Sequence, residues 1–182
     1  MIITKKLVNE QKRTQHTAGL FGLHFPMRLE PVVYGLTENL SEDYHGGYWD
    51  FWELSNGGFY MSPRTDKRFN VSCENGYDGE MSADELGITV CLYAYSNLSF
   101  GTESQFTDTC NQQYHWLRDY ALDHDEACDI FRSMIGKMSQ STPVMIVVGL
   151  QIFGVGAEVP HQIKAIKDSP TSSLRCQHVR TI

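Results

Sequence analysis

The spacing of hydrophobic residues predicts a helix that begins near Glu30 and ends at the glycine pair Gly46–Gly47. Pro31 suits the first turn of this helix, because the first helical residues have no use for an N–H donor. Glycine is a common residue at the left-handed position that ends a helix. The apolar residues recur at helical spacing and therefore share one face: Leu29, Val33, Leu36, Leu40 and Tyr44.

Three further helices are predicted over residues 83–100, 107–123 and 125–137. The first of them starts at a capping box, in which the Ser82 hydroxyl accepts the Glu85 N–H and the Glu85 carboxylate accepts the Ser82 N–H. This helix is apolar nearly all round, from Leu86 to Leu98. A helix without a polar face is typical of a protein interior, so we expect this one to be central and buried.

Aromatic, extended segments lie between the first and second predicted helices. Residues 48–54 (YWDFWEL) and 59–62 (FYMS) favour strands, and Asn56-Gly57 between them suits a tight hairpin turn. A third strand is predicted over residues 68–73, where apolar and polar residues alternate. Turns are predicted at the two later dipeptides of the same kind, Asn75-Gly76 and Asp78-Gly79.

These elements predict an α+β fold, with a small antiparallel sheet (the aromatic hairpin plus one or two further strands) packed with about four helices. We expect three parts along the chain: a polar, solvated arm over residues 1–26, the folded domain over 27–138 and an extension over 139–182. The apolar run at 144–159 is shorter than the roughly twenty residues of a membrane span. Residues 1–16 lack the apolar core of a signal peptide, so we expect a cytoplasmic protein.

Composition narrows the possible partners. The formal net charge of −7 argues against broad nucleic-acid binding, which usually needs a basic surface, and it is too small for a protein that mimics DNA along its whole length. The 5 cysteines include no CxxC pair. Buried thiols in a reducing compartment explain them better than a metal or redox motif does.

No catalytic motif stands out from the sequence. The serines lack a GxSxG context, and the glycine-rich turns lack the lysine of a phosphate loop. His115, Asp119 and Asp123 follow one another at four-residue spacing and suggest a hard-metal site, but a solvated helix face explains them better. Asp50 and Glu53 point to opposite faces of a strand and form a poor acid–base pair. We therefore expect no enzyme activity, no metal and no cofactor.

Two surfaces remain as recognition sites. The aromatic hairpin belongs mainly to the core, yet its polar and partly exposed residues suggest a compact aromatic and acidic patch. This first candidate surface comprises Asp50, Trp52, Glu53, Asn56 and Tyr60. The second candidate is an acidic face near the start of the last helix, formed by Asp119, Asp123, Asp125, Glu126 and Asp129.

The hairpin block GGYWDFWELSNGGFYM (residues 46–61) resembles the characteristic segment of the KlcA/ArdB antirestriction proteins. The flanking segments are similar to that family too: ENLSEDY at 38–44, GEMSADELGITVCLYAYSNLSF at 79–100 and YHWLRDYALDHDEACDIFRSMI at 114–135. The resemblance covers about residues 20–138, and the family domain normally ends near the last helix. Residues 139–182 therefore depart from the family pattern.

The resemblance implies a non-catalytic protein, carried by plasmids, phages and other mobile elements, that protects incoming DNA from type I restriction-modification systems. The implied partner is the restriction enzyme itself or a host factor that controls it, with neither strong nucleic-acid binding nor membrane binding. Two alternatives stay open. One is an acidic DNA mimic that occupies the DNA-binding groove of the restriction enzyme, and the other is an uncharacterised enzyme that uses the hairpin and the region of His115 and Asp119.

Overall fold

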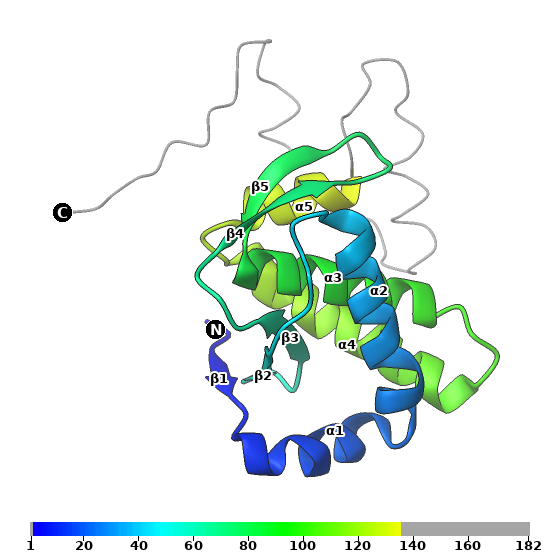
Figure 1. Ribbon diagram of the computed structural model, residues 1–182. Coiled ribbons are helices and arrows are strands. Elements are labelled where there is room, and N and C mark those ends of the chain that lie inside the picture. The colour runs from blue at the N-terminus through cyan, green and yellow to red at the C-terminus, as the bar shows by residue number, and fades with distance from the viewer. Residues whose placement is uncertain (1, 136–182) are drawn as a thin grey trace. The chain divides into compact units, whose positions relative to one another are not determined.

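Helix α3 (Ala83–Leu98) forms the centre of the computed structural model, which describes residues 2–135 (Figure 1). Eleven of its residues are buried, as its apolar composition predicts, and it contacts α2, α4, α5 and strand β3. The capping box at Ser82 and Glu85 is present with both hydrogen bonds. The other helices are α1 (Arg13–Phe21), α2 (Glu30–Leu40), α4 (Ser104–Leu122), α5 (Ala127–Ile135), the short 3-10 helix η1 (Glu10–Lys12) and the π-helix η2 (Phe25–Leu29).

Two small antiparallel sheets complete the described fold, and the predicted α+β class is confirmed. The strands are β1 (Lys5–Leu7), β2 (Trp49–Leu54), β3 (Phe59–Pro63), β4 (Arg68–Ser72) and β5 (Asp78–Ser82). The first sheet has the order β1-β2-β3, and the second pairs β4 with β5. The predicted hairpin is β2–β3, with Trp52 opposite Tyr60. Gly57 occupies its turn at φ +94°, a conformation that other residues rarely adopt.

Strand β3 lies at a sheet edge, yet all five of its residues are buried. Side chains from two helices satisfy its outer backbone groups. The Gln113 amide oxygen accepts the Phe59 N–H at 2.8 Å, the Tyr95 hydroxyl donates to the Phe59 carbonyl at 2.9 Å, and the Cys91 sulfur accepts the Met61 N–H at 3.4 Å. Because a buried, unpaired backbone group is costly, these three side chains stabilise the buried edge of β3.

Helix α3 crosses β3 at a glycine. A Cβ atom on Gly87 would lie 2.4 Å from the Ser62 Cβ and 2.6 Å from the Met61 carbonyl oxygen. Those distances are far inside van der Waals contact, and one of the atoms belongs to the backbone. The close approach of helix and strand therefore requires glycine at position 87.

The N-terminal segment differs from the solvated arm that its polar composition predicts. Strand β1 pairs with β2, with Lys6 opposite Glu53, and α1 buries Thr17 and Phe21. Phe25 follows on η2 and contacts the rings of Phe21, Phe51 and Phe59. Few apolar residues are needed here because the hairpin supplies the other half of this core, which the local composition does not reveal.

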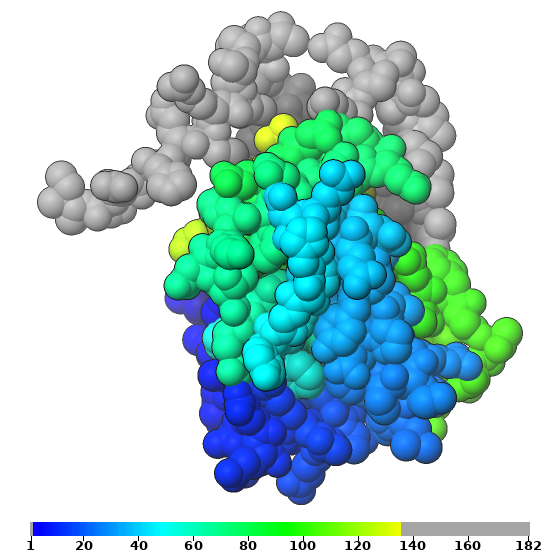
Figure 2. All heavy atoms as spheres, viewed as in Figure 1, coloured from blue at the N-terminus to red at the C-terminus, as the bar shows by residue number. Residues whose placement is uncertain are grey.

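Helix α2 ends at Leu40, before the predicted stop at Gly46–Gly47. Hydrogen bonds to distant parts of the chain hold the residues after Leu40 in extended and turn conformations. The Asp43 carboxylate accepts from the backbone N–H and the side-chain amide of Asn70. The Trp49 indole N–H donates to the Tyr44 hydroxyl at 2.8 Å. In Figure 2 this segment runs over the surface between α2 and the β4–β5 hairpin. The prediction of one apolar stripe reaching Tyr44 was wrong for that reason.

The β4–β5 hairpin contains a second correction. Asn75-Gly76 forms the predicted turn, with Gly76 at φ +84°, but Asp78-Gly79 lies in strand β5. At Gly79 a Cβ atom would meet the hydroxyl end of the Tyr77 ring, so any larger residue there would displace that ring. A glycine that signals a turn in sequence here marks a close side-chain approach.

The described residues lie within one compact unit that ends at Lys137. The predicted extension over 139–182, with its apolar run, lies outside the described residues, and the proposed boundaries at 26 and 138 stay predictions. None of the helices described for residues 2–135 is both long enough and apolar enough to cross a membrane.

Candidate functional site

The first candidate surface is not a continuous exposed patch. Tyr60 has no exposed area; its ring stacks between Trp52 and Tyr120, with centroid separations of 6.2 Å and 5.9 Å. Trp52 is half-buried and donates its indole N–H to Ser62. Strand alternation did not reveal the burial of Tyr60, because β3 is covered on both faces.

The polar members of that surface also have structural partners. Asp50 bridges Arg13 at 3.3 Å and Arg64 at 2.8 Å. Asn56 donates to the Trp116 carbonyl at 2.9 Å and accepts the Gly58 N–H at 3.1 Å. Of the five predicted residues only Glu53 is exposed. A recognition role for these five residues stays a prediction. The contacts of Asp50 and Asn56 join neighbouring segments of the fold.

The second candidate surface is divided among α4, the turn that follows it and α5. Three of its acids lie beside arginines: Asp119 beside Arg118 at 3.0 Å, Glu126 beside Arg68 at 3.2 Å and Asp129 beside Arg132 at 3.3 Å. Asp123 and Asp125 are exposed at the end of α4 and in the turn. This pairing breaks the negative charge into short ion pairs and leaves no uniform acidic stripe over these five residues.

His115 and Asp119, which suggested a metal site, lie on α4 with Arg118 between them. Burial and the charge of Arg118 lower the pKa of His115, and Arg118 pairs with Asp119. A cation at this position competes with a metal ion for the same carboxylate. Across residues 2–135 the structure places no three histidine, cysteine or acidic side chains together as metal ligands.

A polar cluster at the start of α3 brings together residues that lie far apart in the sequence. Asp84 accepts from Lys5 at 2.6 Å, from the Tyr60 hydroxyl at 2.8 Å and from His124 Nε2 at 3.0 Å. His124 Nδ1 accepts the Glu126 N–H at 3.1 Å, so Nε2 is the nitrogen that carries the proton. Lys5 also lies 4.5 Å from the centre of the Trp52 ring. The cluster ties β1, β3 and the α4–α5 turn to α3.

Asp84 is charged in this cluster. Burial raises its pKa, but the hydrogen bonds from His124 and Lys5 and the charge of Lys5 outweigh that effect and hold the pKa at about 2. Each oxygen of the carboxylate already has a donor. The sequence marks Asp84 only as a residue of the capping-box turn, because its partners are 79, 24 and 40 positions away.

The neighbouring Glu85 has the opposite character. It is 1% exposed, and its Oε2 accepts the Ser82 N–H, whereas Oε1 has no hydrogen-bond partner among the described residues. Burial and the nearby charges of Glu126 and Asp129 raise the pKa of Glu85 to about 8, so it is mostly protonated at neutral pH. Arg68 lies 3.9 Å away and is shared with Glu126. Two adjacent acids on one helical turn therefore carry different charges.

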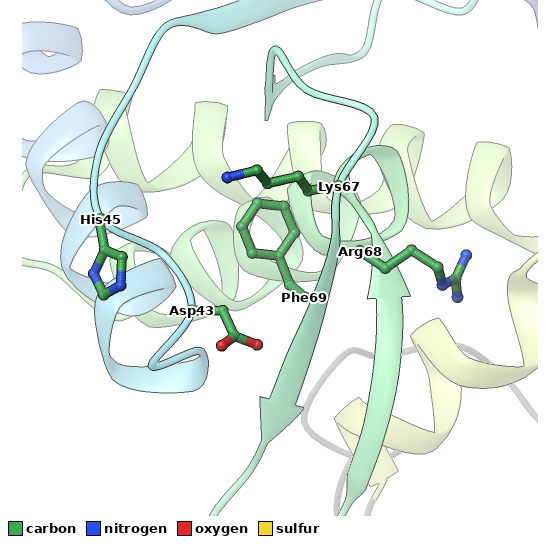
Figure 3. Close-up of a pocket in the computed structure, with 5 residues that line it drawn as sticks. All are labelled: Asp43, His45, Lys67, Arg68 and Phe69. Atoms are coloured by element: carbon green, nitrogen blue, oxygen red, sulfur yellow. The ribbon is translucent and has the colours of Figure 1, made fainter.

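A shallow concavity of about 470 Å³ lies between the loop after α2 and β4 (Figure 3). Lys67 lies across Phe69, His45 and Asp43 lie on the loop side, and the Arg68 side chain points away from them (Figure 3). Asp43 is already held by Asn70, and Arg68 pairs with Glu80 and Glu126. The polar groups of this concavity therefore do not converge on one point, as those of a catalytic pocket must.

A second concavity, of about 420 Å³, runs between α1 and α4. Gly19 and Leu20 contribute one wall, and α4 contributes the other. The residues from α4 are Gln105, Asp108, Thr109, Gln112, Gln113 and Trp116. No sequence pattern marks this groove, because its α4 residues are ordinary polar residues of a surface helix.

Comparison with known proteins identifies the class to which this fold belongs. The sequence model of the family described as "Antirestriction protein" matches residues 42–134. The antirestriction protein KlcA of Escherichia coli is 38% identical over 136 residues, which are 72% of this chain and 94% of KlcA. YafX of Escherichia coli K12, an uncharacterized protein, is 44% identical over 109 residues, 57% of this chain and 68% of YafX.

A solved structure agrees with these relatives. It comes from work on the KlcA and ArdB proteins, which describes a novel fold and antirestriction activity against type I DNA restriction systems in vivo but not in vitro. It superposes with a TM-score of 0.68 at 35% identity and covers 74% of this chain and 96% of that one. This chain belongs to the KlcA/ArdB family of antirestriction proteins, as the hairpin block indicated.

Proposed function

We propose that this chain protects incoming DNA of mobile elements from type I restriction-modification systems, and that it acts in the cytoplasm without catalysing a reaction. The likeness to the KlcA/ArdB structure carries the proposal, because it combines 35% identity with a match to 96% of that chain.

The side chains of the described domain support recognition as its mode of action. The aromatic block is mostly core, since Trp49, Phe51, Phe59 and Tyr60 are all buried. The cluster of Lys5, Asp84 and His124 has its acid held by donors from β1, β3 and the α4–α5 turn. A carboxylate with a pKa of about 2 is a weak base at neutral pH, and three donors already bind this one, which argues against its use as a general base.

We further propose that the direct partner is a protein, either the restriction enzyme or a host factor that controls it. Activity in vivo but not in vitro, as described for KlcA and ArdB, is expected when a further cell component takes part. Direct occupation of the DNA groove by an acidic mimic is the less favoured alternative. Asp119, Glu126 and Asp129 lie beside arginines, and an effective mimic needs uncompensated charge.

The test is the plating of unmodified phage on a host with a type I restriction system, with and without this gene. We expect the gene to raise the efficiency of plating on the restricting host and to leave plating on a non-restricting host unchanged. Unaltered restriction, in cells that contain the soluble protein, would refute the proposed function. Competition between the purified protein and DNA for the purified enzyme at low salt would instead support the DNA-mimic alternative.

A further inference from the structure

The groove between α1 and α4 has the geometry and the chemistry of a peptide-docking site. We propose that it binds an extended segment of a partner protein that carries a lysine or an arginine, and that the antirestriction activity depends on this contact. The inference rests on the proposed function and adds to it the surface and the kind of partner.

The α4 wall of the groove is one continuous helix face. Gln105, Asp108, Thr109, Gln112 and Trp116 follow at i, i+3, i+4, i+7 and i+11, the spacing at which side chains lie above one another. On the α1 side, apart from its chain neighbours and the backbone of its own helix, no atom lies within 4 Å of the position that a Cβ on Gly19 would occupy. The small residue therefore keeps that wall low, and Leu20 adds an apolar, partly buried contact.

The polar groups in the groove match those of a polypeptide backbone. Glutamine side chains both donate and accept hydrogen bonds, as a peptide chain does, and Gln105 and Gln112 are exposed and available for such bonds. An extended segment bound in this way gains affinity from main-chain contacts and specificity from a few side chains.

The charge of the groove selects the kind of segment. Asp108 is the only charged lining residue, it is exposed, and no ion pair or hydrogen bond of its carboxylate is found in the part of the chain that the structure describes. Among residues 2–135, no lysine or arginine lines the groove. A phosphate backbone would be repelled here, whereas a basic side chain complements the carboxylate. The groove thus favours a basic polypeptide over nucleic acid.

One end of the groove packs against the turn of the aromatic hairpin. Trp116 is half-buried; its carbonyl accepts from Asn56, and its ring lies 3.4 Å from the Cβ position of Gly57. The neighbouring Gln113 binds the Phe59 N–H and the Gly57 carbonyl. Tryptophan is enriched among the residues that dominate binding energy. The hairpin turn of the family block therefore acts here as a support for the groove.

Charge substitutions at two exposed aspartates test the proposal in the phage assay. Asp108→Lys puts a cation into the groove, and Asp66→Lys makes the same change of charge in the turn between β3 and β4, outside the groove and outside both candidate surfaces. We expect Asp108→Lys to lower protection about tenfold or more, and Asp108→Asn to lower it by a smaller factor, with Asp66→Lys close to wild type. Circular dichroism and melting curves establish that each variant is folded.

The possible results separate this inference from the proposed function. Loss of protection by folded Asp108→Lys, with protection retained by Asp66→Lys, supports the groove. Full protection by both folded lysine variants overturns the groove and leaves the proposed function standing. Equal loss in both variants also overturns it, because the charge effect would then be general. If Asp108→Lys does not fold, Asp108→Asn decides in the same way. An inactive wild-type protein refutes the proposed function and, with it, the role of the groove.

Discussion

Glu85→Gln isolates the effect of one buried carboxyl on the pH dependence of stability. The pKa of Glu85 is about 8 in the folded protein, and an unfolded glutamate has a pKa of about 4.3. The unfolded chain therefore releases this proton first. Between these two pH values the folded state binds more protons than the unfolded state, so the free energy of unfolding falls as the pH rises, and the effect levels off above pH 8.

The size of this effect follows from the two pKa values. At about 1.4 kcal/mol per pH unit, the loss between them reaches at most about 5 kcal/mol. Arg68, at 3.9 Å, and water drawn into the site would stabilise the ionised form, so we expect about 2–3 kcal/mol. Glutamine has no proton to release and keeps the capping box, since its amide oxygen also accepts the Ser82 N–H.

Urea denaturation of both proteins between about pH 5 and pH 9 measures the difference directly. The stability of Glu85→Gln relative to wild type should rise by about 2–3 kcal/mol across that range and then become constant. The change with pH is decisive, because the new amide N–H groups add an offset that does not depend on pH. Glu80→Gln, which removes an exposed carboxylate beside Arg68, is the matched control. Parallel curves for wild type and Glu85→Gln would refute the reasoning.

Two further predictions concern stability. Gly87→Ala should lower the free energy of unfolding by about 3 kcal/mol, because the new Cβ meets the β3 backbone. Gly35→Ala in α2 has open space around the new Cβ and should raise the free energy of unfolding by up to about 1 kcal/mol. Urea denaturation measures both variants, and equal effects would contradict the packing argument. Asp84→Asn should lower the free energy of unfolding by about 1–2 kcal/mol at neutral pH, because the pKa of Asp84 is lower in the folded protein than in the unfolded chain. The stability that the Asp84 carboxylate contributes is present above about pH 4 and is lost as the pH falls through about 2. Acid titration of both proteins measures this, and a deficit in Asp84→Asn that persists unchanged at the lowest pH would disprove it.

Local sequence signals predicted much of the fold because the interactions behind them are local. The capping box joins residues three positions apart, and the Asn-Gly turns at 56–57 and 75–76 need only a backbone that tolerates positive φ. Alternation along β4 correctly indicated that Phe69 and Val71 are buried. The family resemblance likewise depends on contiguous segments, so it was visible before any three-dimensional information.

The candidate site was less predictable because its contacts join distant parts of the chain. Tyr60 looked available for recognition, but β3 is covered on both faces and buries it completely. Helix α2 ends early because Asp43 and Tyr44 have partners on β4 and β2. Neither composition nor periodicity contains information about such pairs.

The sequence by itself determined the order of most elements, the central place of α3 and the family, since each depends on neighbours along the chain or on contiguous similarity. Only the tertiary structure decided the charges of Asp84 and Glu85, which are adjacent and chemically alike. Their pKa values are about 2 and about 8. Donors from β1, β3 and the α4–α5 turn stabilise the ionised form of Asp84, whereas Glu85 is buried beside other acids that disfavour its ionised form. Electrostatic environment is set by distance in space, and folding alone brings those groups within reach.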